Sequence, residues 1–372
     1  MVKLSVSELK PGMIVAEPII TKRGQSISKE GTELTNQLIA KLTFYKIEEV
    51  CVEDTKTAPV DEVDFDEKPV EAKETVSSQI TYTQRLKASP DFQKFQTDYA
   101  LNLSYLKENF EAIIAGMGAD CTEMLLENTE PLYKSKTALE LFDMLANMHT
   151  LEDPIYAHSI NVAIIARSIG KWLKYPREDL DTLTVCGLLH DIGKTQVPDE
   201  ILNKPGKYTD EERDIMRSHP KLGAKILKGK GFDSRVISAA LQHHERADGS
   251  GYPRGLTDDE IDEFASIIAI ADAYDGMTCA RSHREPMCSF QVIEEFENEG
   301  LKKFHTKYIL TFLERIANTY NNSRIILNNA KTGRVVYINK SNLSRPVIQL
   351  DSGEILNLAD SKSAGLFIKA IL

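Results

Sequence analysis

Histidine and aspartate side chains interrupt several apolar stretches of this 372-residue chain. Five of its eight histidines lie close together along the chain, most of them in such stretches: His158, His190, His219, His243 and His244. Two aspartates, Asp191 and Asp272, lie in similarly apolar surroundings. Burying an ionised carboxylate without a partner is costly, whereas neutral imidazoles and carboxylates around a metal ion satisfy one another. One such histidine alone would more often be a hydrogen-bonded core residue, but seven residues together predict a buried metal site.

His190 and Asp191 are neighbours in the stretch LLHDIGK. Neighbouring residues on a helix point about 100° apart, but at a helix end both can reach one site, and we expect Gly193 to end this helix. A carboxylate can bridge two metal ions roughly 3.5–4 Å apart, so Asp191 is the predicted bridge. Lys194, about one turn on, would direct a positive charge at the same cavity, or would be a solvated lysine favoured by the helix dipole.

Composition and charge exclude several classes of protein. The net charge of −11 argues against broad binding to nucleic-acid polymers, which needs a basic surface. The sequence has no apolar run of roughly 18 residues, and its start lacks the apolar core of a signal peptide. Its five cysteines are scattered, without a CxxC pair, as is typical of reduced thiols. We therefore expect a cytoplasmic protein that does not insert into a membrane.

Apolar patterning divides the chain into five predicted segments. Residues 1–56 combine short β-like runs with one amphipathic helix, which predicts a small α+β domain. An acidic linker follows at 57–82. Helical periodicity then runs through a connecting segment, 83–150, and through the histidine-bearing segment, 151–320. Alternation around Gly and Asn turns predicts a β-rich appendage at 321–372, so the expected fold class is mostly α.

Five short motifs occur in order between Ile155 and Phe304: HDIGK, HP, HHE, DGSGYP and DAYD. In type and spacing they resemble the HD-GYP family, a branch of the HD superfamily of metal-dependent phosphohydrolases. The stretch SVSELKPGMIVAE is similar to the small domain that often precedes the catalytic domain in this family. The resemblance implies an HD-type helical bundle. It also implies hydrolysis of the bacterial second messenger cyclic di-GMP to linear pGpG, or onward to GMP, with two or three iron or manganese ions.

Carried onto this chain, the resemblance implies two metal sites that share Asp191. The first would be completed by His158, His190 and Asp272, and the second by His219, His243 and His244. A metal-bridging hydroxide would be the nucleophile, with Asp191 and Lys194 as the catalytic residues. The residues expected to bind the substrate are Lys194, Gly251, Tyr252, Asp275, Arg281 and Arg284.

The sequence departs from the family at one informative position. Members with a third metal usually carry a glutamate one helical turn before the first histidine, where this chain has Pro154. Proline cannot ligate a metal, and the nearby Glu152 and Asp153 have the wrong spacing. We therefore predict two metal ions and pGpG as the product.

Three rival functions stay open at this point. The chain could be a receptor that binds cyclic di-GMP without cleaving it, a hydrolase of another cyclic dinucleotide or of a nucleoside polyphosphate, or a di-iron oxygenase. The intact ligands and Lys194 favour an enzyme over a receptor, and the GYP loop and arginines favour a cyclic dinucleotide. A homodimer formed through the helices before His158, and a signalling partner for residues 1–53, are compatible with the sequence.

Overall fold

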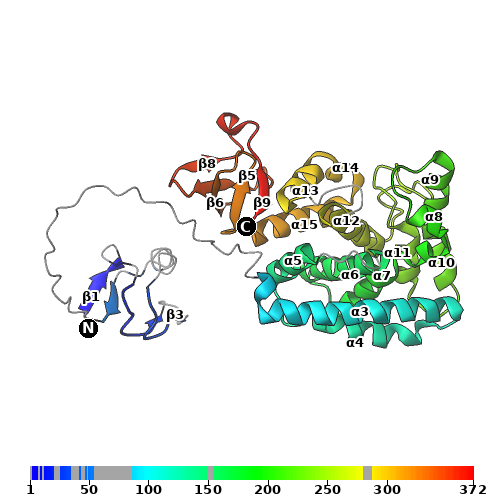
Figure 1. Cartoon of the computed structure of the whole chain (residues 1–372), viewed down its shortest axis with the longest axis horizontal. Coiled ribbons are helices and arrows are strands. Elements are labelled where there is room, and N and C mark those ends of the chain that lie inside the picture. Colours follow the sequence, from blue (N-terminus) through cyan, green and yellow to red (C-terminus); the bar gives the residue numbers. More distant parts are fainter. Residues whose placement is uncertain are drawn as a thin grey trace, which may run out of the picture. The chain divides into compact units, whose positions relative to one another are not determined.

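A computed structural model of the chain describes residues 86–148, 154–279 and 287–372, together with parts of the first 53 residues (Figure 1). Those parts are residues 2–6, 9–10, 12–20, 26–34, 42, 47 and 49–53. Contacts between residues divide the molecule into two units, Met1–Val76 and Ser77–Leu372. The predicted acidic linker lies outside the described residues.

The first unit contains short strands around a core of its own. Its described strands are β1 (Val2–Ser5), β2 (Ile19–Ile20), β3 (Ser26–Ser28) and β4 (Glu49–Val52). β1 pairs antiparallel with β4, and β2 with β3. Because side chains alternate along a strand, Val50 and Val52 face a buried cluster that includes Val15 and Leu34. The closing strand is as predicted, whereas most of the helix expected before it lies outside the described residues.

Helices dominate the second unit, which confirms the predicted fold class (Figure 1). The longer ones are α3 (Pro90–Ala115), α4 (Thr122–Tyr133), α5 (Ala138–Asn147), α6 (Pro154–Trp172), α7 (Arg177–Leu189), α10 (His219–Leu227), α11 (Ser234–Gln242), α12 (Glu263–Thr278) and α15 (Thr306–Thr319). Shorter turns are η2 (Ala119–Cys121), η3 (Ile192–Gln196), α8 (Asp199–Leu202), α9 (Asp210–Met216), α13 (Ser289–Glu295), η4 (Phe296–Gly300) and α14 (Leu301–Lys303). The predicted connecting segment packs within this same unit, because α3 contacts α6 and α4 contacts α7.

Two helices buried on nearly all sides form the centre of this unit. Every residue from 159 to 170 in α6 and from 264 to 272 in α12 is buried, as expected of helices that are apolar all round. α7 packs closely on α6, since a Cβ atom added at Gly187 would lie 2.4 Å from Cα of Ala163. This close approach brings the C-terminal end of α7 towards the start of α6.

α7 ends earlier than predicted. The expected end was Gly193, but the helix stops at Leu189 and the 3-10 turn η3 follows Asp191. Gly193 packs against the start of α10, because a Cβ atom there would lie 2.0 Å from the carbonyl oxygen of His219. The glycine therefore permits a close backbone approach, which places Asp191 beside His219.

A break between two helices precedes His219. A capping box formed by Thr209 and Glu212 opens α9. α9 then ends at Met216, and α10 begins at His219. The break puts His219 at a helix start, where its side chain can point into the neighbouring site.

A five-stranded antiparallel sheet ends the chain, which confirms the predicted β-rich segment. Its strands are β5 (Arg324–Leu327), β6 (Thr332–Tyr337), β7 (Val347–Leu350), β8 (Ile355–Asn357) and β9 (Ile368–Ile371). Their order is β8-β7-β6-β5-β9, so the last strand pairs with the first. The Glu297 carboxylate of η4 accepts backbone hydrogen bonds from Leu343 (2.6 Å) and Ser344 (3.2 Å), which ties the sheet to the helices. Among the described residues, every helix is too short or too polar to span a lipid bilayer.

Gly193→Ala is expected to destabilise the second unit and to displace His219. The added Cβ atom would collide with backbone atoms, and overpacking of this kind costs about 1–3 kcal/mol. A thermal melt measures the loss. Gly223→Ala is the matched control across the same contact, because its Cβ atom would come no closer than 3.3 Å to Gly193 N. Equal melting temperatures for Gly193→Ala and the wild type would contradict this role of Gly193.

Candidate functional site

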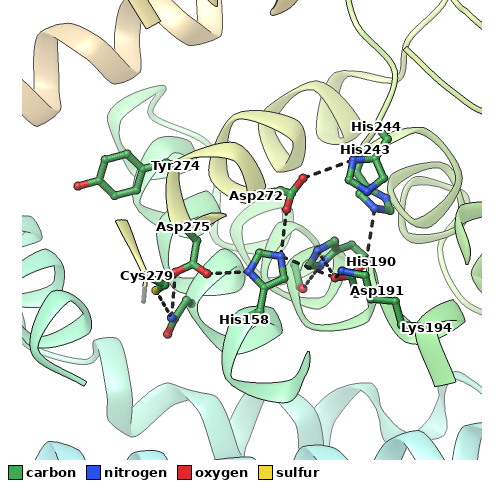
Figure 2. A network of polar contacts seen from close by, with 12 residues as sticks. His158, His190, Asp191, Lys194, His243, His244, Asp272, Tyr274, Asp275 and Cys279 are labelled. Atoms are coloured by element: carbon green, nitrogen blue, oxygen red, sulfur yellow. Dashed lines mark hydrogen bonds and ion pairs between the residues drawn. The ribbon is translucent and has the colours of Figure 1, made fainter. Parts of the chain in front are cut away.

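The seven side chains predicted as metal ligands lie together in the second unit, and Figure 2 labels all of them except His219. They come from α6 (His158), the end of α7 (His190, Asp191), the start of α10 (His219), the end of α11 (His243, His244) and α12 (Asp272). Their donor atoms form three overlapping groups, each with atoms within 4.8 Å of one another. The groups are His158 with His190 and Asp272, His190 with Asp191 and His243, and His219 with His243 and His244.

Three of the imidazoles are oriented by backbone carbonyl groups. Nδ1 of His190 lies 2.8 Å from Gly187 O, Nδ1 of His219 lies 2.7 Å from Met216 O, and Nδ1 of His243 lies 3.0 Å from Ala239 O. A carbonyl oxygen can only accept, so Nδ1 carries the proton in each ring. Burial lowers the pKa of His243 to about 4, so this ring is neutral at pH 7. In the neutral form of each ring, Nε2 presents a lone pair.

Asp191 lies at the centre of the cluster and is fully buried. Its Oδ1 is 3.2 Å from Nε2 of His219, and its Oδ2 is 3.3 Å from Nε2 of His190. Lys194 Nζ donates a hydrogen bond to Oδ2. Burial on its own raises the pKa of Asp191, but the positive charge of Lys194 outweighs it and holds that pKa well below its usual value. The carboxylate is therefore ionised and can act as a ligand on both sides.

A metal ion fits this set of donors. Nε2 of His190 and Oδ1 of Asp191 are buried and have no hydrogen-bond partner among the described residues. Nε2 of His219 and Nε2 of His243 are 3.2 Å apart, and with both rings in the neutral Nδ1–H form neither can donate to the other. Imidazole nitrogen and carboxylate oxygen are ligands for divalent transition metals. Cations bound among these atoms would satisfy all of them together.

His158 lies between two carboxylates of α12 (Figure 2). Its Nε2 is 3.0 Å from Asp272 Oδ1, and its Nδ1 is 2.6 Å from Asp275 Oδ2. Burial on its own lowers the pKa of His158, but the hydrogen bonds to Asp272 and Asp275 outweigh it and raise the pKa to about 9. A cation bound at Nε2 would take the place of that proton, while Nδ1 keeps its bond to Asp275.

The predicted contact between Asp275 and substrate does not agree with this geometry. The side chain is buried, and its Oδ1 accepts a hydrogen bond from Nδ2 of Asn161 (2.9 Å) while Oδ2 is bonded to His158. Both oxygens are thus occupied behind the ligand ring. Asp275 is a positioning residue, of the kind that orients a metal-bound histidine through its second nitrogen.

Two residues that support Asp275 were missed in the sequence. Asn161 lies three residues after His158, and Asp275 lies three residues after Asp272, a spacing that puts each pair on one helix face. From that spacing, a contact between Asn161 and Asp275 could have been predicted. Tyr99 of α3 donates a hydrogen bond to Asn161 Oδ1 (2.7 Å), and no sequence pattern indicated this contact.

Of the other residues predicted to contact substrate, two lie at the cluster and two lie outside the described residues. Lys194 donates to Asp191, and the Tyr252 ring stacks on His244 with centroids 4.7 Å apart, so both lie at the cluster. Arg281 and Arg284 lie outside the described residues, and their contacts with phosphate stay predictions.

The DGSGYP loop is fastened to the end of α11 by a buried carboxylate. Glu245 accepts backbone hydrogen bonds from Arg254 (2.7 Å) and Leu256 (3.0 Å). A Cβ atom at Gly251 would lie 2.4 Å from Cα of Glu245, so only glycine fits there. Gly251 thus has a packing role, and its predicted contact with substrate stays a prediction.

A family model described as "HD domain" matches residues 120–306, about half of the chain. The chain belongs to the HD domain family. This confirms the family resemblance drawn from the sequence. The match also covers every residue of the buried cluster.

Several phosphodiesterases are similar to this chain. A cyclic di-GMP phosphodiesterase of Thermotoga maritima is 30% identical over 297 residues, which cover 76% of this chain and 75% of that protein. A cyclic di-GMP phosphodiesterase of Pseudomonas aeruginosa is 39% identical over 142 residues, 38% of this chain and 34% of that protein. A 3'3'-cGAMP-specific phosphodiesterase of Vibrio cholerae is 33% identical over 184 residues, 48% of this chain and 35% of that protein. The chain thus spans about a third of the length of the last two relatives.

Asn161→Leu is expected to weaken metal binding by this HD domain. The expected loss of affinity is about 10- to 100-fold, which is typical when a residue that supports a metal ligand is removed. Leucine has a similar size, but it cannot donate to Asp275 or accept from Tyr99. Competition with a metal-sensitive dye measures the affinity.

Asn109→Leu is the matched control, because Asn109 is also a buried helical asparagine but bonds only within α3. It should change the melting temperature without changing metal affinity. Equal affinities for Asn161→Leu and the wild type would remove Asn161 from the support of His158.

Proposed function

We propose that this HD domain protein is a metal-dependent phosphodiesterase that hydrolyses cyclic di-GMP to linear pGpG. The observation that carries the proposal is the buried ligand cluster, in which Asp191 Oδ1 and His190 Nε2 lack a hydrogen-bond partner among the described residues. Paired metal ions in such centres serve the hydrolysis of phosphate esters. Two of the relatives carry the activity in their names, and one of them matches three quarters of the chain.

The cluster would bind two divalent ions, iron or manganese, with Asp191 as the shared ligand. The first ion would be bound by His158, His190 and Asp272, and the second by His219, His243 and His244. When bound, the ion pair supplies Lewis-acid stabilisation for the charge that develops on the phosphate. Two ions are expected because Pro154, the first residue of α6, lies one turn before His158 and offers no donor atom. A two-ion site favours pGpG as the end product.

Among the described residues, Lys194 is well placed to act on a phosphate. Its ammonium has three N–H donors and gives one of them to Asp191, so two are left for phosphate oxygens. The side chain is 21% exposed, so a ligand can reach it. Lys194 would bind the phosphate that is cleaved and stabilise its charge in the transition state, while Asp191 fixes the spacing of the two metal sites.

A hydrolase of another cyclic dinucleotide is the second candidate, because a relative is named as specific for 3'3'-cGAMP. A receptor that binds cyclic di-GMP without turnover would use the same ligands and differ only in the missing reaction. The cytoplasmic location, the homodimer and a signalling partner for residues 1–53 stay predictions from the sequence.

Elemental analysis of protein purified without oxygen is expected to give two metal ions per chain. His244→Ala removes a ligand of the second site alone, so about one ion should remain. Asp191→Ala removes the shared ligand, so both sites should lose metal. Three ions in the wild type would contradict the inference from Pro154, and full occupancy in Asp191→Ala would contradict the bridging role.

Anaerobically prepared protein loaded with iron or manganese is expected to convert cyclic di-GMP to pGpG, which chromatography separates from GMP. Lys194→Ala should lower kcat about 10²–10³-fold, the usual effect of removing one group that stabilises developing charge. The double variant His190→Ala, Asp191→Ala should abolish turnover and serves as the control for contaminating enzymes.

Parallel reactions with 3'3'-cGAMP separate the candidate functions. Faster turnover of 3'3'-cGAMP than of cyclic di-GMP would replace the proposed substrate. Tight binding of cyclic di-GMP by the metal-loaded protein without any product would favour a receptor.

A further inference from the structure

Tyr252 lies between a metal-ligand histidine and an arginine. Its ring stacks on the imidazole of His244, with centroids 4.7 Å apart and an angle of 29° between the planes. The guanidinium carbon of Arg217 lies 4.5 Å from the centroid of the same ring. The ring of Tyr252 thus contacts both a predicted metal ligand and a guanidinium group.

Tyr252 joins two separate parts of the chain. Its backbone N–H donates to the carbonyl oxygen of His244 (3.1 Å), which fixes the loop to the end of α11. Arg217 comes from another segment, the C-terminal end of α9, two residues before the ligand His219. Arg217 contacts Tyr252, and Tyr252 contacts the predicted ligand His244. Tyr252 therefore holds an arginine close to the metal ligands.

Arg217 carries a charge that no carboxylate neutralises among the described residues. It is exposed and makes no ion pair or side-chain hydrogen bond there. Arg213, one turn earlier on α9, differs because its guanidinium is bonded to Asp210 (2.9 Å). An arginine against an aromatic face is stabilised by the cation–π interaction and keeps its N–H groups at the ring edge for another partner. That planar set of donors matches the oxygens of a phosphate group.

We propose that Arg217 binds the second phosphodiester of the cyclic dinucleotide, the one that is not cleaved, and that Tyr252 positions it for this contact. The inference rests on the proposed function. A cyclic dinucleotide contains two phosphodiesters, and only one can lie at the metal ligands. The other lies one nucleotide away and needs a cation at a short distance from the centre. Lys194 is bonded to Asp191, whereas Arg217 contacts the ring of Tyr252, which stacks on His244.

The test compares a substrate that has two phosphodiesters with one that has a single phosphodiester. Cyclic di-GMP and bis(p-nitrophenyl) phosphate are hydrolysed in parallel by the metal-loaded wild type, Arg217→Gln, Arg217→Lys and Arg213→Gln. Loss of a charge-assisted hydrogen bond to a ligand weakens binding about tenfold or more. Arg217→Gln should therefore raise KM and the Kd for cyclic di-GMP at least about tenfold, with kcat within about twofold. Arg217→Lys should lie between it and the wild type.

Hydrolysis of bis(p-nitrophenyl) phosphate should be the same in all four proteins, and Arg213→Gln should behave as the wild type on both substrates. The proposal would be overturned if Arg217→Gln lost activity equally on both substrates, or if it lost activity on neither. Equal metal content and melting temperature of Arg217→Gln and the wild type exclude a general effect on folding.

Binding separates a failure of this inference from a failure of the proposed function. If the wild type binds cyclic di-GMP without cleaving it, the enzyme assignment fails, and a weaker Kd of Arg217→Gln still supports the phosphate contact. If the wild type cleaves bis(p-nitrophenyl) phosphate but neither binds nor cleaves a cyclic dinucleotide, both proposals are overturned.

Discussion

The structure of this site depends on one ionised carboxylate buried in the helical unit. A charge in the interior must be compensated by cations or hydrogen bonds, because removing an ion from water costs on the order of several kcal/mol. Lys194 compensates Asp191 from the same turn but bonds to only one of its oxygens. The other oxygen faces His219 and His243 without a hydrogen bond among the described residues. Metal binding would complete the compensation, so occupancy of the centre and stability of the fold are linked.

The predicted histidine ligands also provide hydrogen-bond donors for carbonyl groups at the ends of helices. The last carbonyl groups of a helix have no partner within it. Gly187, Met216 and Ala239 lie in the last turns of α7, α9 and α11, and the Nδ1 atoms of His190, His219 and His243 bond to their carbonyl oxygens. The same contacts direct Nε2 into the cluster. Local helix ends thus prepare the ligands before any metal binds.

That these seven side chains lie together could be predicted from the sequence, because most are polar residues within apolar stretches and each belongs to a recognisable motif. The helical class and the terminal sheet could also be predicted from periodicity. The end of α7 could not, because Gly193 serves a contact with α10 that has no local signature. For the same reason Asp275 was taken for a substrate contact: its bonds to His158 and Asn161 depend on how α6 and α12 pack.

The arrangement around Tyr252 bears on which part of a substrate this site can distinguish. The ring of Tyr252 is already in contact with His244 and with the guanidinium group of Arg217. Lys194 and Arg217 are cations, which recognise phosphates, and phosphates are common to all cyclic dinucleotides. The proposed phosphate contacts would therefore leave the choice between guanine and adenine to other residues. Relatives similar to this chain are named for cyclic di-GMP in one case and for 3'3'-cGAMP in another.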